Sequence, residues 1–374
     1  MHTLKKIFSF KLSLKAVLFF GLILLCSWHV FPQGALHWSN DGNSYYTINN
    51  DNVLEFKLPS QDVNVLLSKK QLTPKGKLQP LNLDYFTFSK DEQKILLFTN
   101  TQKVWRINTR GDYWVLDVFT GNLVQLGKTL PESSLMFAKF SPDGKKVAYV
   151  SGNNVYVEDL ESSAIKALTN DGTDTLINGT FDWAYEEEFF CRDGFRWSPD
   201  SKSIAYWQID ASKTKKFYMI NNTDSIYSRI IPIEYPKVGE TPSSCKVGVV
   251  TIDNAKTTWI TIPGDPRQHY LVRMEFIPSN GQLLIQQLNR KQNDSKLFIS
   301  DSHTGNSQVI YEEKDDAWVD IYRNELVEYN IDFTNNFNWL NNGKNILWVT
   351  EKDGWRHLYN VSLEGKKEQL ITKG

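Results

Sequence analysis

The chain has 374 residues and a net charge of −1, with 42 Lys and Arg against 43 Asp and Glu. A near-neutral chain gives no electrostatic sign of a nucleic acid or an anionic membrane surface as a partner. Aromatic residues make up 13% of the sequence, and Gly, Asn and Asp recur in turn-like positions. This balance is typical of an all-β globular protein with one large domain or two small ones.

Residues 1–33 are predicted to form a signal peptide or an N-terminal anchor. Four lysines precede an apolar run at residues 16–26, and polar sequence follows at once. The run is short for a membrane span and suits a signal peptide, but no clean cleavage site follows, so an uncleaved anchor is the alternative. Either way, residues 34–374 are expected to be exported to a periplasm or the cell exterior. Membrane contact would come only through a retained N-terminal segment.

The three cysteines are too few for a disulfide framework. Cys26 lies in the targeting segment, and Leu25 before it is a poor fit to the small residue that lipoprotein processing requires. The spacing of Cys191 and Cys245 does not show whether they pair. Unpaired, packed thiols are the default expectation.

From about residue 35 the sequence repeats a unit of strand, tight turn and strand. The turns are rich in Ser, Asn, Asp, Pro and Gly, and each precedes an apolar, β-prone run. They lie at residues 38–42, 88–91, 140–144, 197–200, 276–281 and 339–343. Four short strands per unit, at a period of roughly 50 residues, predict the blades of a β-propeller. A β-sandwich is the alternative, but six matching units at similar spacing favour the propeller.

Residues 182–190, Asp-Trp-Ala-Tyr-Glu-Glu-Glu-Phe-Phe, interrupt this strand-rich pattern. Adjacent carboxylates among aromatic rings repel one another and lose hydration, so the cluster is costly unless a cation meets it. In the simpler interpretation, Asp182 caps a short helix and Glu186, Glu187 and Glu188 form its solvated first turn. The flanking aromatic residues, which favour burial, argue for a site instead.

The acidic stretch, together with residues 195–200 (Phe-Arg-Trp-Ser-Pro-Asp) and 204–206 (Ile-Ala-Tyr), closely resembles the N-terminal propeller of dipeptidyl peptidase IV. That domain belongs to a branch of the prolyl oligopeptidase family of serine peptidases. The resemblance implies that Glu187 and Glu188 bind the free amino terminus of a substrate peptide. Two carboxylates can accept charge-assisted hydrogen bonds from one ammonium group. The family pattern has eight blades, of which about six to seven are expected here.

Arg106 lies just after the hairpin of the second repeat. Composition alone predicts a surface Arg on a blade. The resemblance instead implies that Arg106 points into the central cavity and holds a backbone carbonyl of the substrate, a task that suits its planar fork of donors. A shorter match at residues 318–323 implies that Tyr322 and Arg323 contribute to the cavity wall.

The spacing between the fourth and fifth repeats is wider than the rest, with an insertion around residues 215–245. Residues 225–239 within it are apolar and β-prone. Such a ribbon is either an edge covered by a partner or a long loop. The resemblance implies an arm that projects from the propeller and joins two protomers, so a homodimer is expected.

No catalytic residue is predicted in this chain. There is no Gly-x-Ser-x-Gly motif, the six His are scattered, and the α/β-hydrolase pattern of alternating strands and helices is missing. In the resembled family that domain follows the propeller, so we expect the propeller to be incomplete at its C-terminus. The chain would then be inactive by itself and represent a truncated gene product, a sequence fragment or a domain of a longer enzyme.

The sequence therefore predicts the N-terminal propeller region of a serine exopeptidase that releases N-terminal dipeptides, typically Xaa-Pro. The alternative is a non-catalytic exported propeller that binds peptides or proteins, since propellers carry many functions. No phosphate-binding loop, zinc-ligand spacing or basic-aromatic patch is present, so no cofactor, metal or nucleic-acid partner is predicted.

Overall fold

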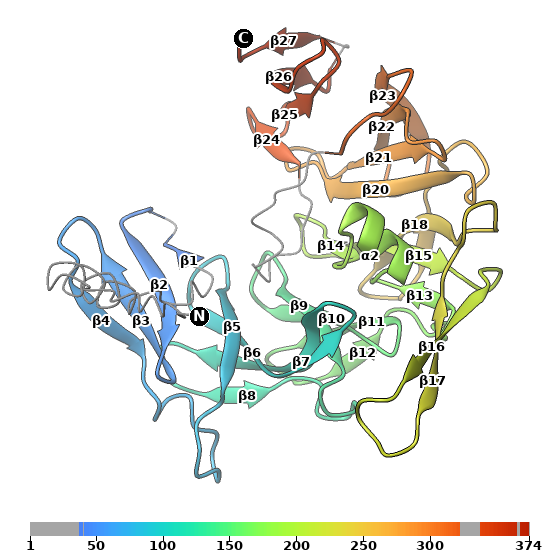
Figure 1. Ribbon diagram of the computed structural model, residues 1–374. Helices are drawn as coiled ribbons and strands as arrows, with labels where there is room; N and C mark the ends of the chain where they lie inside the picture. Colours follow the sequence, from blue (N-terminus) through green and yellow to red (C-terminus); the bar gives the residue numbers. More distant parts are fainter. Residues whose placement is uncertain (1–36, 40, 322–336, 365–366, 374) are drawn as a thin grey trace, which may run out of the picture.

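The computed structural model describes residues 37–39, 41–321, 337–364 and 367–373. These residues form six consecutive antiparallel sheet units that follow one another around an arc, from β1–β4 to β24–β27 (Figure 1). The predicted all-β propeller of four-stranded blades is confirmed, with six blades in the described ranges. The predicted leader at residues 1–33 lies outside those ranges. No helix within them is long and apolar enough to cross a membrane.

In most blades the strands lie in chain order from one side of the sheet to the other. Blade 1 contains β1 (His37–Trp38), β2 (Ser44–Asn49), β3 (Asn52–Lys57) and β4 (Val63–Leu67). Blade 2 contains β5 (Leu83–Phe88), β6 (Lys94–Val104), β7 (Ile107–Asp117) and β8 (Leu123–Gln125). Blade 3 contains β9 (Leu135–Phe140), β10 (Lys146–Ser151), β11 (Asn154–Asp159) and β12 (Ile165–Ala167).

Blade 4 is interrupted twice, by a helix and by an arm. It contains β13 (Leu176–Asn178), β14 (Phe195–Trp197), β15 (Ser203–Asp210), β18 (Ser244–Thr251) and β19 (Thr257–Trp259). The interruptions are α2 (Trp183–Phe189) and the paired strands β16 (Lys216–Asn221) and β17 (Arg229–Glu234). Blade 5 contains β20 (His269–Phe276), β21 (Leu283–Asn289), β22 (Asp294–Ser300) and β23 (Ser307–Lys314). Blade 6 contains β24 (Asn338–Leu340), β25 (Asn345–Thr350), β26 (His357–Ser362) and β27 (Glu368–Leu370).

The repeated turn that the sequence shows is closed in the same way in several blades. In blade 4, the Ser198 hydroxyl donates to Asp200 Oδ1 at 2.7 Å and accepts the Ser203 N–H at 2.9 Å. The same pair of contacts recurs in blades 1 to 3, at Ser39, Ser89 and Ser141. Side-chain hydrogen bonds to nearby backbone define such turns locally. This explains why the repeat was readable from sequence.

In the part of the chain that the structure describes, the hydrophobic core consists of five clusters, and each lies between two neighbouring blades. The largest, between blades 4 and 5, contains Trp207, Leu271 and Ile285, with residues of α2. Blades 2 and 3 also pair directly, because β7 and β9 share a short ladder at Gly111. A Cβ added at Gly111 would come within 2.6 Å of the Thr99 carbonyl oxygen on β6, so glycine is required where β7 passes its own neighbour within blade 2. The blades are therefore held by face-to-face packing of their sheets.

Cys191 and Cys245 are both buried in the cluster between blades 4 and 5, and both are free thiols. The default expectation of unpaired, packed thiols is confirmed. Burial raises the pKa of Cys191 to about 12, so its thiol stays protonated and unreactive at neutral pH.

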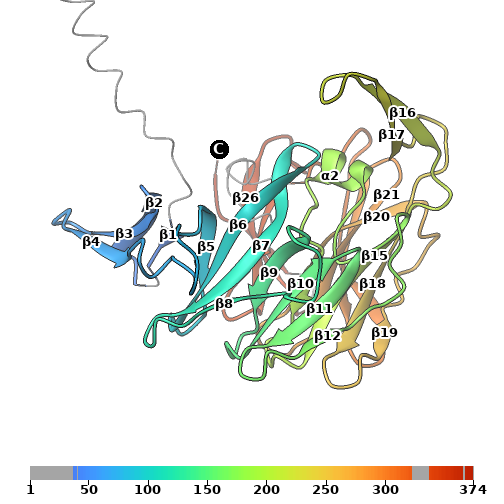
Figure 2. The same cartoon turned by 90° about the horizontal axis from the view of Figure 1, so that it is seen from below.

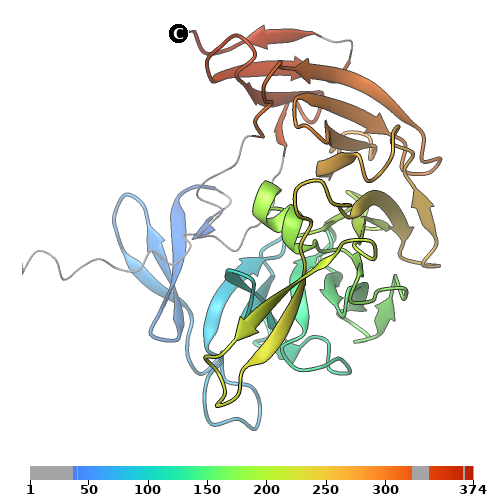
Figure 3. The same ribbon diagram turned by 45° about the vertical axis from the view of Figure 1, so that its right-hand side comes forward.

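The insertion predicted around residues 215–245 forms an antiparallel arm, β16–β17, that projects beyond the blades in Figure 2 and crosses in front of the cyan and green strands in Figure 3. Its apolar side chains are largely exposed, with Ile220 71% and Ile230 65% accessible. At its base, the Tyr235 ring lies 4.4 Å from the Trp183 ring of α2, measured between centroids. The arm therefore begins beside the helix that carries the acidic stretch.

Candidate functional site

The acidic stretch folds as the short helix α2. Its first turn begins at Asp182, whose carboxylate accepts the Tyr185 N–H at 3.1 Å, so the predicted cap is confirmed. The helix ends at Phe190, which has a φ of 57° and donates its N–H to the Glu186 carbonyl. Tyr185 and Phe189 are 2% exposed and pack into the core between blades 4 and 5. This anchor fixes which way the three acids face.

The three consecutive acids have three different environments. Glu186 is buried and forms an ion pair with Arg192, with 2.9 Å between Oε1 and Nε. Burial raises the pKa of Glu186, and Arg192 opposes that shift. Glu187 is partly exposed and Glu188 is exposed. The interpretation of a wholly solvated first turn is therefore wrong for Glu186, because the helix rotates about 100° per residue and turns this side chain inward.

Glu187 is held by Arg106, which comes from a different blade. Strands β6 and β7 extend well past the blade 2 sheet, and their two-residue loop carries Trp105 and Arg106 to the side of α2 (Figure 2). Arg106 Nε lies 2.7 Å from Glu187 Oε1, and Arg106 Nη2 lies 2.8 Å from Glu187 Oε2. This is a bidentate, fork-to-carboxylate pair. Arg106 lowers the pKa of Glu187, so the carboxylate stays ionised to lower pH.

Glu188 is held from blade 5. The side-chain amide of Gln292 donates to Glu188 Oε1 at 2.9 Å across 104 residues of sequence. Gln292 lies in the turn between β21 and β22 and is 9% exposed. Sequence analysis missed this residue, because a lone glutamine in a polar turn carries no pattern that marks it.

The structure brings together three of the five predicted site residues: Arg106, Glu187 and Glu188. Tyr322 and Arg323 lie outside the described residues. Among the residues that are described, no group of His, Cys, Asp or Glu is arranged to hold a metal ion.

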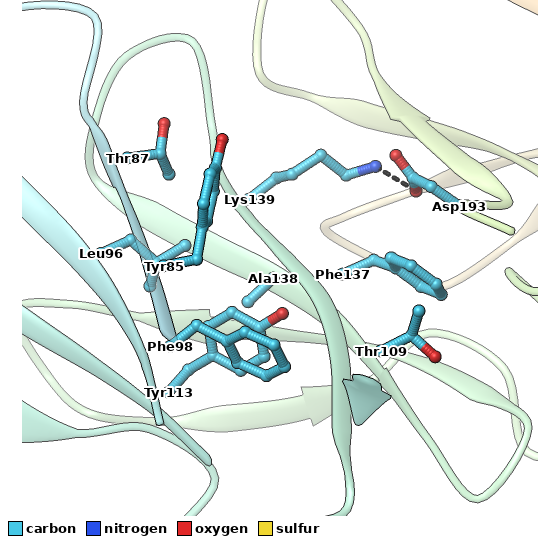
Figure 4. A pocket seen from close by; sticks show the side chains of 10 residues that line it. All are labelled: Tyr85, Thr87, Leu96, Phe98, Thr109, Tyr113, Phe137, Ala138, Lys139 and Asp193. Carbon is cyan, nitrogen blue, oxygen red and sulfur yellow. Dashed lines mark hydrogen bonds and ion pairs between the residues drawn. The ribbon is translucent and has the colours of Figure 1, made fainter. Parts of the chain in front are cut away.

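A second polar group lies on the inner strands of neighbouring blades, and sequence analysis missed it. Lys139 on β9 pairs with Asp193 and donates to the Phe195 carbonyl at 2.8 Å, and Arg196 Nη1 lies 3.3 Å from Asp193 Oδ2. A cavity of about 130 Å³ opens beside Lys139 and Asp193, lined also by tyrosine and threonine side chains of blade 2 (Figure 4). The sequence signal was available, since charged residues interrupt otherwise apolar inner strands.

One further acid joins this inner surface. Glu275 on β20 is 8% exposed and accepts the Trp339 indole N–H of blade 6 at 2.9 Å. Burial raises the pKa of Glu275 from 4.5 to about 7, against the opposing effect of Arg196 in blade 4. The Glu275 carboxyl group therefore joins blades 5 and 6 by a hydrogen bond and feels the charge of Arg196 in blade 4.

Comparison with known proteins gives one family. Residues 89–374 match the model of the dipeptidyl peptidase IV (DPP IV) N-terminal region. Dipeptidyl aminopeptidase B of Saccharomyces cerevisiae is 30% identical over 296 residues, which is 77% of this chain and 35% of that protein. Inactive dipeptidyl peptidase 10 of Rattus norvegicus is 26% identical over 347 residues, which is 90% of this chain and 41% of that protein.

The solved structures agree in fold. The crystal structure of Porphyromonas gingivalis dipeptidyl peptidase 4 superposes with a TM-score of 0.80 at 25% identity, covering 91% of this chain and 47% of that one. The chain spans less than half the length of each of these relatives. Because the family model matches most of the sequence, this chain belongs to the dipeptidyl peptidase IV N-terminal region family.

Proposed function

We propose that this chain is the N-terminal propeller region of an exported dipeptidyl peptidase IV-like serine exopeptidase, and that Glu187 and Glu188 bind the free amino terminus of the substrate. The longer protein would release N-terminal dipeptides, typically Xaa-Pro, with a catalytic triad that is not in this chain. One observation carries the proposal: two adjacent, accessible carboxylates on a rigid helix are each fixed by a donor from another blade.

The charges of the cluster suit an ammonium group. Glu187 and Glu188 carry two negative charges and Arg106 one positive charge, so these three side chains together leave one negative charge. A peptide ammonium group has three N–H donors in a tetrahedral arrangement and can bond two carboxylates at once. An acetylated amino terminus has lost its charge and two of these donors. The site would therefore select a free amino end, which is what an enzyme needs to count two residues from it.

Arg106 has a supporting role in this proposal. Its bidentate contact fixes the plane of the Glu187 carboxylate, so less side-chain freedom is lost when the ammonium group binds. Its position at the tip of a long hairpin also suits contact with a backbone carbonyl of the bound peptide.

The test is a binding titration with the 374-residue chain and a tripeptide that carries either a free or an acetylated amino terminus. Glu187→Gln and Glu188→Gln keep the shape of the side chain and remove its charge. Each should weaken binding of the free-amine peptide by at least about ten-fold, since hydrogen bonds to charged groups contribute ~1.5–3 kcal/mol. Glu161→Gln removes an exposed acid from blade 3 and serves as the control. Equal binding of both peptides by the unmodified chain would refute the proposal.

A non-catalytic peptide-binding propeller is the second candidate, and one observation favours it. A relative that aligns with 90% of this chain carries the name inactive dipeptidyl peptidase 10. The mass of the natural product in its source cells separates the two candidates. A product much larger than this chain that releases dipeptides supports the peptidase, and a stable product of this length without activity supports the binding module.

We also propose that the arm β16–β17 joins two copies of this chain. The support is its exposed apolar surface, including Ile220, Ile226 and Ile230, on a two-stranded ribbon whose base packs beside α2. An apolar ribbon with both faces in water is an unfavourable arrangement for an exported protein, and a second copy would cover it. Light scattering on the purified chain measures this directly.

A further inference from the structure

Gln292 occupies a backbone conformation that its side chain does not favour. Its φ is 55°, in the left-handed region where glycine is the usual residue. The turn around it is fixed by Asn289, whose carbonyl accepts the Gln292 N–H at 2.9 Å and whose side chain accepts the Asn293 N–H at 3.0 Å. Other non-glycine turn residues of this chain share this conformation, so the case for Gln292 depends on what its side chain contacts.

The Gln292 side chain reaches α2, where its Nε2 donates a hydrogen bond to Glu188 Oε1 at 2.9 Å. Gln292 is buried and Glu188 is exposed, so this hydrogen bond is shielded from water on the glutamine side only. Glutamine is also neutral. It can orient a carboxylate without cancelling the negative charge, whereas Lys or Arg in its place would neutralise it. Arg106 does neutralise Glu187, so the two acids are fixed by donors of different charge.

The backbone of Gln292 adds a second connection. Its carbonyl accepts the Val319 N–H at 2.8 Å, and the neighbouring Asn293 carbonyl accepts the Asp315 N–H at 3.1 Å. Val319 is 4% exposed and therefore firmly packed. The turn of blade 5 is thus tied on one side to α2 and on the other side to the segment that follows β23. This double attachment leaves the Gln292 amide little freedom to move away from Glu188.

We propose that Gln292 is a positioning residue that sets the orientation of the Glu188 carboxylate for a bound peptide ammonium group while preserving its charge. The proposal rests on the proposed function of Glu187 and Glu188. Gln292 does not itself touch the peptide. Its contribution is the fixed direction of the Glu188 oxygens, which reduces the ordering that binding requires.

Two variants of Gln292 separate positioning from folding. Gln292→Leu keeps most of the buried volume and removes the donor. Gln292→Gly also removes the donor, but glycine adopts a φ of 55° without strain, so the turn should be retained. Lys291→Ala, at the adjacent exposed position, is the matched control. Each variant is titrated by NMR with the free-amine and the acetylated tripeptide, and its thermal unfolding is measured.

Both Gln292 variants should lose several-fold in affinity for the free-amine peptide, because the Glu188 side chain must then be ordered on binding, which costs ~0.5–1.5 kcal/mol. Affinity for the acetylated peptide should not change, and Lys291→Ala should behave like the unmodified chain. Equal losses for both peptides would show a merely structural role and overturn the proposal.

The remaining outcomes distinguish this proposal from the one on which it rests. Unchanged free-amine affinity in both Gln292 variants, together with a loss in Glu188→Gln, would overturn the role of Gln292 and leave the proposed function intact. If the unmodified chain does not prefer the free amine, the proposed function fails and the positioning role fails with it.

Discussion

Replacing Glu275 by glutamine should change how the stability of the propeller depends on pH. The carboxyl group is buried where blades 4, 5 and 6 meet, and its pKa in the folded chain is about 7 instead of 4.5. Below pH 4.5 it is protonated in both the folded and the unfolded chain. Between pH 4.5 and 7 it ionises in the unfolded chain but stays protonated in the folded chain. The free energy of unfolding therefore falls as pH rises through this window.

The size of the effect follows from the pKa shift. Raising the pKa from 4.5 to about 7 gives a loss of about 3 kcal/mol by the time the pH exceeds the folded pKa, because a tenfold change in an ionisation constant corresponds to ~1.4 kcal/mol. Glu275→Gln cannot ionise, and it keeps an acceptor for the Trp339 indole N–H. The variant should therefore equal the unmodified chain near pH 4.5 and exceed its stability by about 3 kcal/mol near pH 8.

The assay is denaturant unfolding at a series of pH values, followed by tryptophan fluorescence, for the unmodified chain and for Glu275→Gln. Comparing the two chains at each pH cancels the contribution of the other titrating groups. Arg196 and Arg273 both favour the charged form and oppose the shift, as does the Trp339 hydrogen bond. Parallel stability curves for the two chains from pH 4.5 to 8 would refute the argument that burial raises the pKa of Glu275.

Three further predictions concern the pair on α2, the repeated turn and the arm. Arg106→Leu should move the loss of free-amine peptide binding to higher pH, because Glu187 no longer has the cation that lowers its pKa, and binding titrations from pH 3 to 7 measure this. Ser198→Ala removes two hydrogen bonds from a buried turn residue and should lower the melting temperature by about 2–4 °C in a thermal scan. Ile220→Lys on the arm should convert a dimer to a monomer in light scattering, whereas Val65→Lys, at a similarly exposed apolar position on β4, should not.

The fold was predictable because its signals are local. Each blade is marked by a turn whose Ser and Asp side chains bond the backbone a few residues away, as at Ser141 and Asp143. Alternation of apolar residues along short strands supplies the rest. Neither signal depends on how the blades are arranged around the arc, so the number and order of the units could be predicted from sequence. The arm was predictable for the same reason, as an apolar, β-prone insertion.

The site was predictable only in part, because its contacts are long-range. The sequence indicated that three adjacent acids need a cation, and Arg106 and Arg192 lie beside Glu187 and Glu186 respectively. Resemblance to a family, rather than any residue pattern, singled out Arg106. Gln292 could not be predicted, since its contact with Glu188 depends on how blade 5 packs against α2.

The shortness of α2 shows why the site depends on the whole arc. A helix of seven residues is too short to be stable by itself, so its position is set by what surrounds it. Tyr185 and Phe189 fix it to the core between blades 4 and 5, Arg106 reaches it from blade 2, and Gln292 reaches it from blade 5. A change in the angle between blades would therefore alter the separation of the two donors and with it the directions of the two carboxylates. Packing between blades, far from any peptide, is for this reason part of what the site needs in order to bind an ammonium group.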